Sequence, residues 1–198
     1  MTLWLKARAV PAVIATAAAS LLVLILPFST LSGTPSPAGA TVALAVLLGL
    51  AMPVVLGWGM ARSDRLLETA STRPIAVLDI SLVLGAGLGV AVADVVLRVA
   101  GIAPAGSIAG RATATFIGFV LASVPVIGWR NASTVPVIYF VAVVVAGRGT
   151  DVAHPAPWAW IASPDGDVWA MTAAVVTLLV GTVIYLRTRG SSYLLQEN

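Results

Sequence analysis

The sequence predicts an all-α protein, an integral membrane bundle of about six transmembrane helices with both termini in the cytoplasm. Hydrophobic residues make up 59% of the 198 residues and charged residues only 10%, and the mean hydropathy is +1.01. A water-soluble domain cannot bury that much apolar surface. No polar stretch is long enough to fold separately, so we expect residues 1–198 to form one transmembrane domain.

Six apolar runs predict the helices in order. They cover residues 9–28, 41–59, 75–99, 112–129, 134–147 and 168–186. A helix needs about 20 apolar residues to cross the hydrocarbon core. Four runs are close to that length, the third is longer and the fifth is the shortest. The first run exceeds the apolar region of about 7–15 residues in a signal peptide, so we expect an uncleaved helix.

The basic residues predict the orientation, because they gather at cytoplasmic span ends. With the N-terminus inside, the cytoplasmic side holds most of the eleven basic residues, namely Lys6, Arg8, Arg62, Arg65, Arg73, Arg130, Arg187 and Arg189. Arg98, Arg111 and Arg148 then lie at outer ends. The six tryptophans lie at run ends or in flanking loops, as expected for an aromatic belt at the membrane interface.

Composition excludes several classes of site. The chain has no cysteine, which excludes disulfides and thiolate metal sites, and His154 is its single histidine. We therefore expect no metal, no cofactor and no catalytic residues. The net charge of +3 comes from the arginines that set the topology, and it gives no reason to expect nucleic acid as a partner. The single lysine is Lys6, so the chain has no Walker A motif.

The glycine-rich stretch at residues 85–89 lies in the middle of the third run. It resembles a nucleotide loop, but no soluble strand precedes it. We expect Gly85 and Gly89 to act instead as a small-xxx-small pair that packs two helices closely together.

The loop at residues 60–74 has the residue pattern of a short amphipathic helix. Ser63 or Asp64 can cap a short helix that ends before Pro74. Leu66 and Leu67 lie on its apolar face. An amphipathic helix at the inner membrane surface is predicted, either as a charged connector or as a docking site for a cytoplasmic partner.

The loop at residues 148–167 is the second patterned connection. Its prolines prevent a regular helix, yet residues 157–162, with Trp158 and Trp160, are too apolar to stay in water. Irregular backbone at membrane depth needs protein or a wet cavity around it. We expect the short fifth helix to end early and the chain to continue as an external re-entrant segment.

Three charges lie inside the third run, where a charge is costly and often functional. Asp79 is one turn from the cytoplasmic end, where we expect water within reach. Asp94 and Arg98 are four residues apart and are predicted to pair near the outer end. Proton coupling through Asp94 is the alternative.

This layout resembles the membrane subunit of an ABC-2-type exporter. The resemblance rests on six spans with both ends inside, the amphipathic helix between spans two and three, and the re-entrant segment between spans five and six. Residues 68–74 (ETASTRP) and 158–160 (WAW) are similar to compact actinobacterial permeases of that family.

The resemblance implies a permease subunit in the bacterial plasma membrane that moves a drug, a peptide or a lipid-like substrate outward. A separate ABC ATPase subunit would hydrolyse ATP, so the chain would not itself be an enzyme. The partners implied are that ATPase and a second permease subunit, in a homodimer or heterodimer. The family's ATPase-coupling helix falls on Asp64, Arg65, Leu67, Glu68 and Arg73.

Two other classes stay open. The substrate-binding membrane subunits of vitamin importers also have six helices with both ends inside, and Ala15 and Ala19 would suit their helix docking. A proton-coupled carrier would need a polar group of residues within the bundle, for which Asp94 and Arg98 are available.

Overall fold

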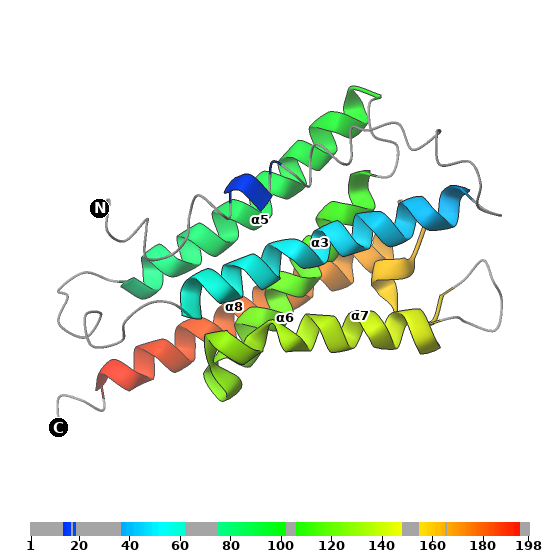
Figure 1. The fold of residues 1–198 in the computed structure, drawn as a ribbon. Helices are drawn as coiled ribbons and strands as arrows, with labels where there is room; N and C mark the ends of the chain where they lie inside the picture. The colour runs from blue at the N-terminus through cyan, green and yellow to red at the C-terminus, as the bar shows by residue number, and fades with distance from the viewer. Residues whose placement is uncertain are drawn as a thin grey trace.

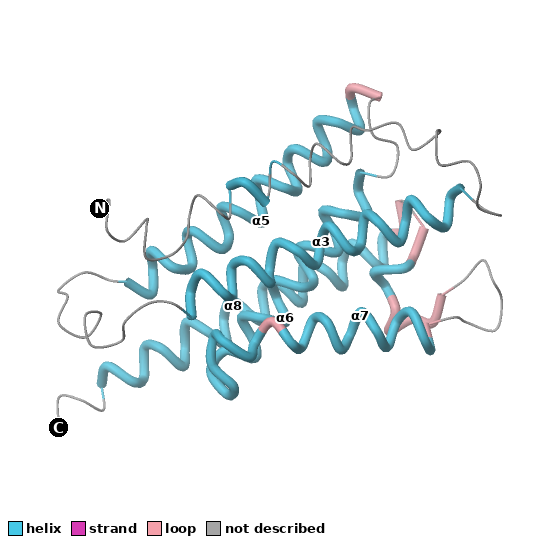
Figure 2. The backbone as a smooth tube through the Cα atoms, in the orientation of Figure 1, coloured by secondary structure: helices cyan, strands magenta, loops and turns pink. Residues whose placement is uncertain are grey.

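The computed structural model describes residues 14–16, 18, 37–61, 75–101, 106–147, 155–164 and 166–194. Within these ranges the chain is helical and contains no strand (Figures 1 and 2). The elements are α3 (Pro37–Ala61), α5 (Ile75–Val99), α6 (Gly106–Ala132), α7 (Thr134–Ala146), the short 3-10 helix η2 (Trp160–Ala162) and α8 (Val168–Leu194).

The helices match the apolar runs from the second to the sixth, so the all-helical prediction is confirmed for them. α5 covers the same residues as the third run, while α6 begins six residues earlier than the fourth. Most of the first run lies outside the described residues. Two helical stretches, Ile108–Ala132 and Val168–Thr188, are long and apolar enough to cross a membrane by length and composition.

α6 is the central helix. It contacts α3, α5, α7, α8 and η2, and Figure 1 shows it passing between α3 and α8. Two groups of buried apolar side chains lie along it. One surrounds Leu121 near the middle of the bundle, and the other surrounds Phe116 nearer to η2. Every other described long helix therefore packs on α6.

Glycines bring α6 into direct backbone contact with α8. A Cβ at Gly118 would lie 2.5 Å from the carbonyl oxygen of Thr177, and a Cβ at Gly181 would collide with the carbonyl of Gly118. α3 approaches α6 in a similar way, since a Cβ at Gly49 would lie 2.9 Å from the Cβ of Ala112. Small residues permit this spacing, and close spacing increases dispersion contacts.

The packing role expected for Gly85 and Gly89 is not found against any described residue. A Cβ added at either position would meet nothing within 4 Å in the part of the chain that the structure describes. Gly87, which lies between them, is the residue that faces α6, where a Cβ would lie 2.8 Å from the Cδ1 of Ile117. The small-xxx-small spacing was present, but the side of α5 that carries it does not face α6.

The long helices alternate in direction, which gives the bundle two ends (Figure 1). α3 ends where α5 begins, at the same end as the C-terminus of α8. η2 and the beginning of α6 lie at the other end, which we call the η2 end. A kink at Gly128, whose φ of 72° suits glycine, turns the chain from α6 toward α7.

The contact between α6 and α8 predicts a difference between two alanine substitutions. Gly118→Ala should destabilise the protein by about 1–3 kcal/mol, because the new methyl group forces two backbones apart. Gly85→Ala should leave the stability unchanged or raise it by up to about 1 kcal/mol, because alanine favours helix over glycine. Thermal unfolding of both variants in detergent measures the difference, and equal stability would contradict the close contact.

Candidate functional site

The connection from α7 to α8 folds back against the η2 end of the bundle. α7 ends at Ala146, and the N–H of Ala156 donates to the carbonyl of Gly147 at 3.0 Å, which returns the chain to the helix it left. Ala159 and Ile161 are fully buried. Residues 155–164, here called the 155–164 segment, therefore pack into the protein, as the sequence indicated for an apolar stretch without regular helix.

Arg111 on α6 holds this segment by its backbone. Its Nη1 donates to the carbonyl of Pro164 at 3.2 Å, and its Nη2 donates to the carbonyls of Ile161 at 3.4 Å and of Ser163. The arginine side chain is only 2% exposed. A buried guanidinium is costly unless its donors are used, and a planar fork suits several acceptors at once. Arg111 therefore joins α6 to a segment about 50 residues away in the sequence.

Aromatic side chains hold the other side of the segment. The hydroxyl of Tyr139 on α7 donates to the carbonyl of Trp158 at 2.8 Å. Nε1 of Trp160 donates to Oγ1 of Thr115, one turn beyond Arg111 on α6, at 3.2 Å. The rings of Tyr139, Trp160 and Phe119 contact one another at centroid distances between 4.9 and 6.3 Å. Rings in such arrangements add about 0.5–1.5 kcal/mol per pair beyond their buried area.

α8 completes the site. Nε1 of Trp169 donates to the carbonyl of Pro157 at 3.3 Å. Asp167 caps the helix, since its Oδ1 accepts from the N–H groups of Trp169 at 3.0 Å and of Ala170 at 3.4 Å. The segment is thus tied to three helices, α6, α7 and α8.

A cavity of about 220 Å³ lies beside this site, between α5, α6 and α8. Its walls are apolar except for Arg111, which lies on one wall. Arg111 therefore donates hydrogen bonds to the 155–164 segment and also lines the cavity. Within the described residues, no group of three metal-binding side chains comes together.

The structure does not describe the side chains of most of the predicted site residues. Asp64, Arg65, Leu67, Glu68 and Arg73 lie outside the described residues. Asp94 and Arg98 lie on α5, but their side chains are not described, so their pairing stays a prediction.

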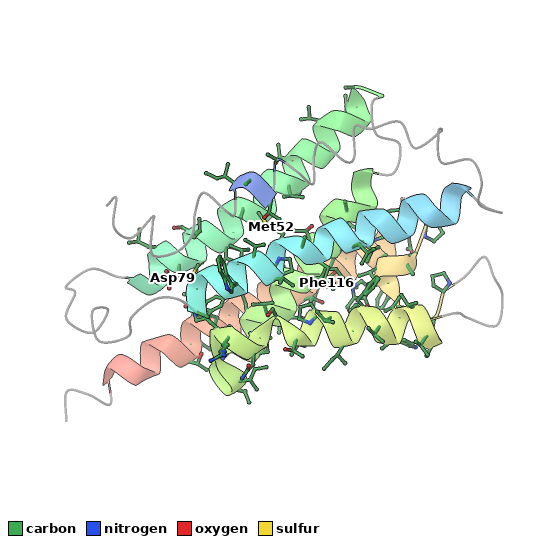
Figure 3. The ribbon with its side chains drawn as sticks, in the orientation of Figure 1. Met52, Asp79 and Phe116 are labelled. Carbon is green, nitrogen blue, oxygen red and sulfur yellow. The ribbon has the colours of Figure 1, made fainter. Side chains whose placement is uncertain are left out.

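Asp79 is buried, at 1% exposure, near the beginning of α5 and away from Phe116 (Figure 3). The expectation that water reaches this carboxylate was wrong, because the residue is almost completely buried.

The two tryptophans of the segment differ from a simple interfacial belt. Trp158 is 41% exposed, whereas Trp160 is partly buried in the aromatic cluster. Trp129, at the opposite end of the bundle, is also buried and packs edge-to-face on Tyr185 at 5.5 Å. Trp58 and Trp169 are exposed, as the belt interpretation expects.

Arg111 is the important residue that the sequence analysis missed as a site. It was placed at an outer end beside other arginines. The available signal was its position directly before the fourth apolar run, close to Thr113 and with Thr115 one helical turn later. Both threonine hydroxyls donate to carbonyls one turn earlier, at 2.8 and 3.0 Å, so both hydroxyl donors are used within α6.

Comparison with known proteins found no match: no family model, no curated protein and no solved structure matches this chain.

Replacement of Arg111 should loosen the 155–164 segment before the rest of the bundle. Arg111→Gln removes donors from buried carbonyls, and an unsatisfied buried acceptor costs about 1–3 kcal/mol. Hydrogen exchange of the backbone amides of residues 156 and 158–163 should rise at least tenfold, which corresponds to about 1.4 kcal/mol. The amides in the middle of α8 should keep their protection.

Two variants serve as controls for this measurement. Arg130→Gln removes an exposed arginine at the opposite end of the bundle and should leave the exchange unchanged. Tyr139→Phe removes one hydrogen bond and should give a smaller increase than Arg111→Gln. Unchanged exchange of the segment in Arg111→Gln would show that Arg111 does not anchor it.

Proposed function

We propose that the protein is a multi-pass protein of the bacterial plasma membrane, a bundle of six transmembrane helices with both termini inside. The exposed surface supports this. Large apolar side chains face outward along several helices, for example Val99 on α5, Val145 on α7 and Leu179 on α8. Contiguous apolar surface of this extent marks contact with lipid or another protein. α8 in particular is long, apolar and mostly exposed.

The alternation of helix directions supports the proposed topology. Arg130 lies where α6 meets α7 and Arg187 lies in the C-terminal part of α8, both toward the end opposite η2. The loop at residues 62–74 joins α3 to α5 at that same end. Basic residues favour the cytoplasmic side, so we assign the η2 end to the outside.

We further propose that the chain is the permease subunit of an ABC exporter. The observation that carries this proposal is the anchored 155–164 segment at the outer end, between the fifth and sixth proposed spans. A connection that merely crossed the surface would not need a buried arginine, a tyrosine and a tryptophan from three helices to hold its carbonyls. Irregular backbone at this depth is tolerated when protein satisfies it.

In this proposal the chain supplies the substrate pathway and another protein supplies the energy. The only lysine of the sequence precedes the first apolar run, so no Walker A motif is available for ATP. An ATPase would act on the loop between α3 and α5, through Asp64, Arg65, Leu67, Glu68 and Arg73. A second permease subunit would complete the pathway.

The proposed orientation predicts which cysteines react from outside. Ala162→Cys should react with an impermeant thiol reagent in intact cells, because residue 162 is exposed at the η2 end, whereas the neighbouring Ser163 is buried. Asn131→Cys, which is exposed at the α6–α7 junction, should react only after the cells are opened. The native chain has no cysteine, which gives a clean background. The reverse pattern would invert the topology.

The exporter proposal predicts that charge reversal at the coupling loop separates the permease from its ATPase. Glu68→Arg and Arg73→Glu should reduce copurification of an ATPase with a Walker A motif, and the ATP hydrolysis of the purified complex, at least tenfold. Like charges brought together at an interface can cost several kcal/mol.

Arg187→Glu is the matched control, because it reverses an exposed charge on the same proposed side of the membrane, outside the loop. It should leave both measurements unchanged. Normal ATPase capture by the two loop variants would reject the coupling role, and reconstituted transport by the chain alone would favour a carrier.

A further inference from the structure

The cavity between α5, α6 and α8 has the form of a slot for one apolar chain. Its walls include Val83 and Val95 at its two ends along α5, Ile117 on α6 and Val175 on α8. Twelve residues of helix separate Val83 from Val95, which corresponds to about 18 Å. The volume of about 220 Å³ lies below the roughly 300–1,000 Å³ of pockets for drug-sized ligands. A long cavity of small volume is narrow.

The slot opens to the outer surface of the bundle along one side. Leu88 and Val95 on α5 are 58% and 59% exposed, and Met171 and Val175 on α8 are both 46% exposed, although all four also line the cavity. A ligand can therefore enter sideways between α5 and α8.

The charge in the wall indicates the chemistry of the ligand. Arg111 lines the part of the cavity nearest the η2 end, together with Gly110 on α6 and Met171 on α8. Its Nη atoms donate to three neutral carbonyls of the 155–164 segment. A guanidinium and a carboxylate carry opposite charges and form short, often bidentate hydrogen bonds, so a carboxylate is the ligand group that complements this cation. An anionic head at Arg111 would leave its apolar tail along the slot.

We propose that this slot binds a fatty-acid-like amphiphile, a single alkyl chain with a carboxylate head, and that Arg111 recognises the head. The carboxylate lies at the η2 end and the chain runs along α5 and α8 toward Val83 and Leu178. As a statement about the transported substrate this rests on the proposed function, whereas the binding is measured without an ATPase.

The test uses the purified full-length chain in discs of zwitterionic phosphatidylcholine. The probes are dodecanoic acid with a photoreactive diazirine near its methyl end and the matching alcohol with the same chain. The acid should label α5 near Val83 or α8 near Leu178, where the methyl end lies, and should bind at least ten times more tightly than the alcohol. Equal binding of acid and alcohol, or labelling elsewhere, would overturn the proposal.

Two valine substitutions on one helix provide the matched pair. Val175 lines the slot and is 46% exposed, whereas Val180 is 50% exposed and lies outside it. Val175→Phe should fill the slot and reduce labelling by the acid at least tenfold, and Val180→Phe should leave it unchanged. Both side chains are about half exposed to the surface, so a larger side chain can be accommodated and both variants should fold. Undiminished labelling of Val175→Phe would reject the slot.

The head-group preference tests Arg111 itself. Arg111→Gln should lower the affinity for the acid to that for the alcohol while the alcohol still labels the same helices. A residue that only supported the fold would alter both probes alike, and that result would overturn the recognition role.

Other occupants of the slot give a different result. If residues 9–28 or a second copy of the chain fill it, the wild type should remain unlabelled on α5 and α8, which rejects the proposal. Val175→Cys should then form a disulfide with a cysteine introduced in that run or with Val175→Cys of the second copy. Labelling by the acid in a protein that captures no ATPase would reject the exporter proposal alone.

Discussion

The contact between the backbones of α6 and α8 at Gly118 and Gly181 is the constraint on which the rest of the bundle depends. In the bilayer that we propose for this chain, hydrophobic burial between apolar helices would contribute little, and close van der Waals contact would replace it. The two glycines allow that contact because they present no Cβ. α3 uses the same device at Gly49 and Ala112, so α6 has close neighbours on two sides. These contacts determine where the beginnings of α6 and α8 lie relative to each other.

The position of α5 follows from a different kind of contact. α5 meets α6 through the side chain of Ile117 opposite Gly87, rather than backbone to backbone. A helix held at side-chain distance leaves more space beside it, and the cavity between α5 and α8 occupies that space. The difference between glycine and isoleucine contacts thus separates a tightly packed part of the bundle from an open one.

Arg111 lies where the tight and open parts meet. On one side it satisfies carbonyls of the 155–164 segment, and on the other it lines the cavity. In the proposed complex with an anionic amphiphile, the anchoring of the segment would depend on the occupant of the cavity, because the head and the carbonyls would share the same guanidinium. In an exporter, this arrangement would connect the presence of a substrate at the outer half of the bundle to the connection between the fifth and sixth spans.

The sequence by itself determined the helices from the second run to the sixth, the early end of α7 and the inward packing of the stretch around Trp160, because these depend on local apolar content and on proline. Only the tertiary structure decided that Arg111 anchors the segment, that Asp79 is covered, and that Gly118 and Gly181 rather than Gly85 and Gly89 bring helices together. Periodicity shows which residues share a side of a helix, but it does not show which side faces a neighbour. When nearly every side of a helix is apolar, hydrophobicity gives no preference among them, and the choice depends on contacts between residues far apart in the chain.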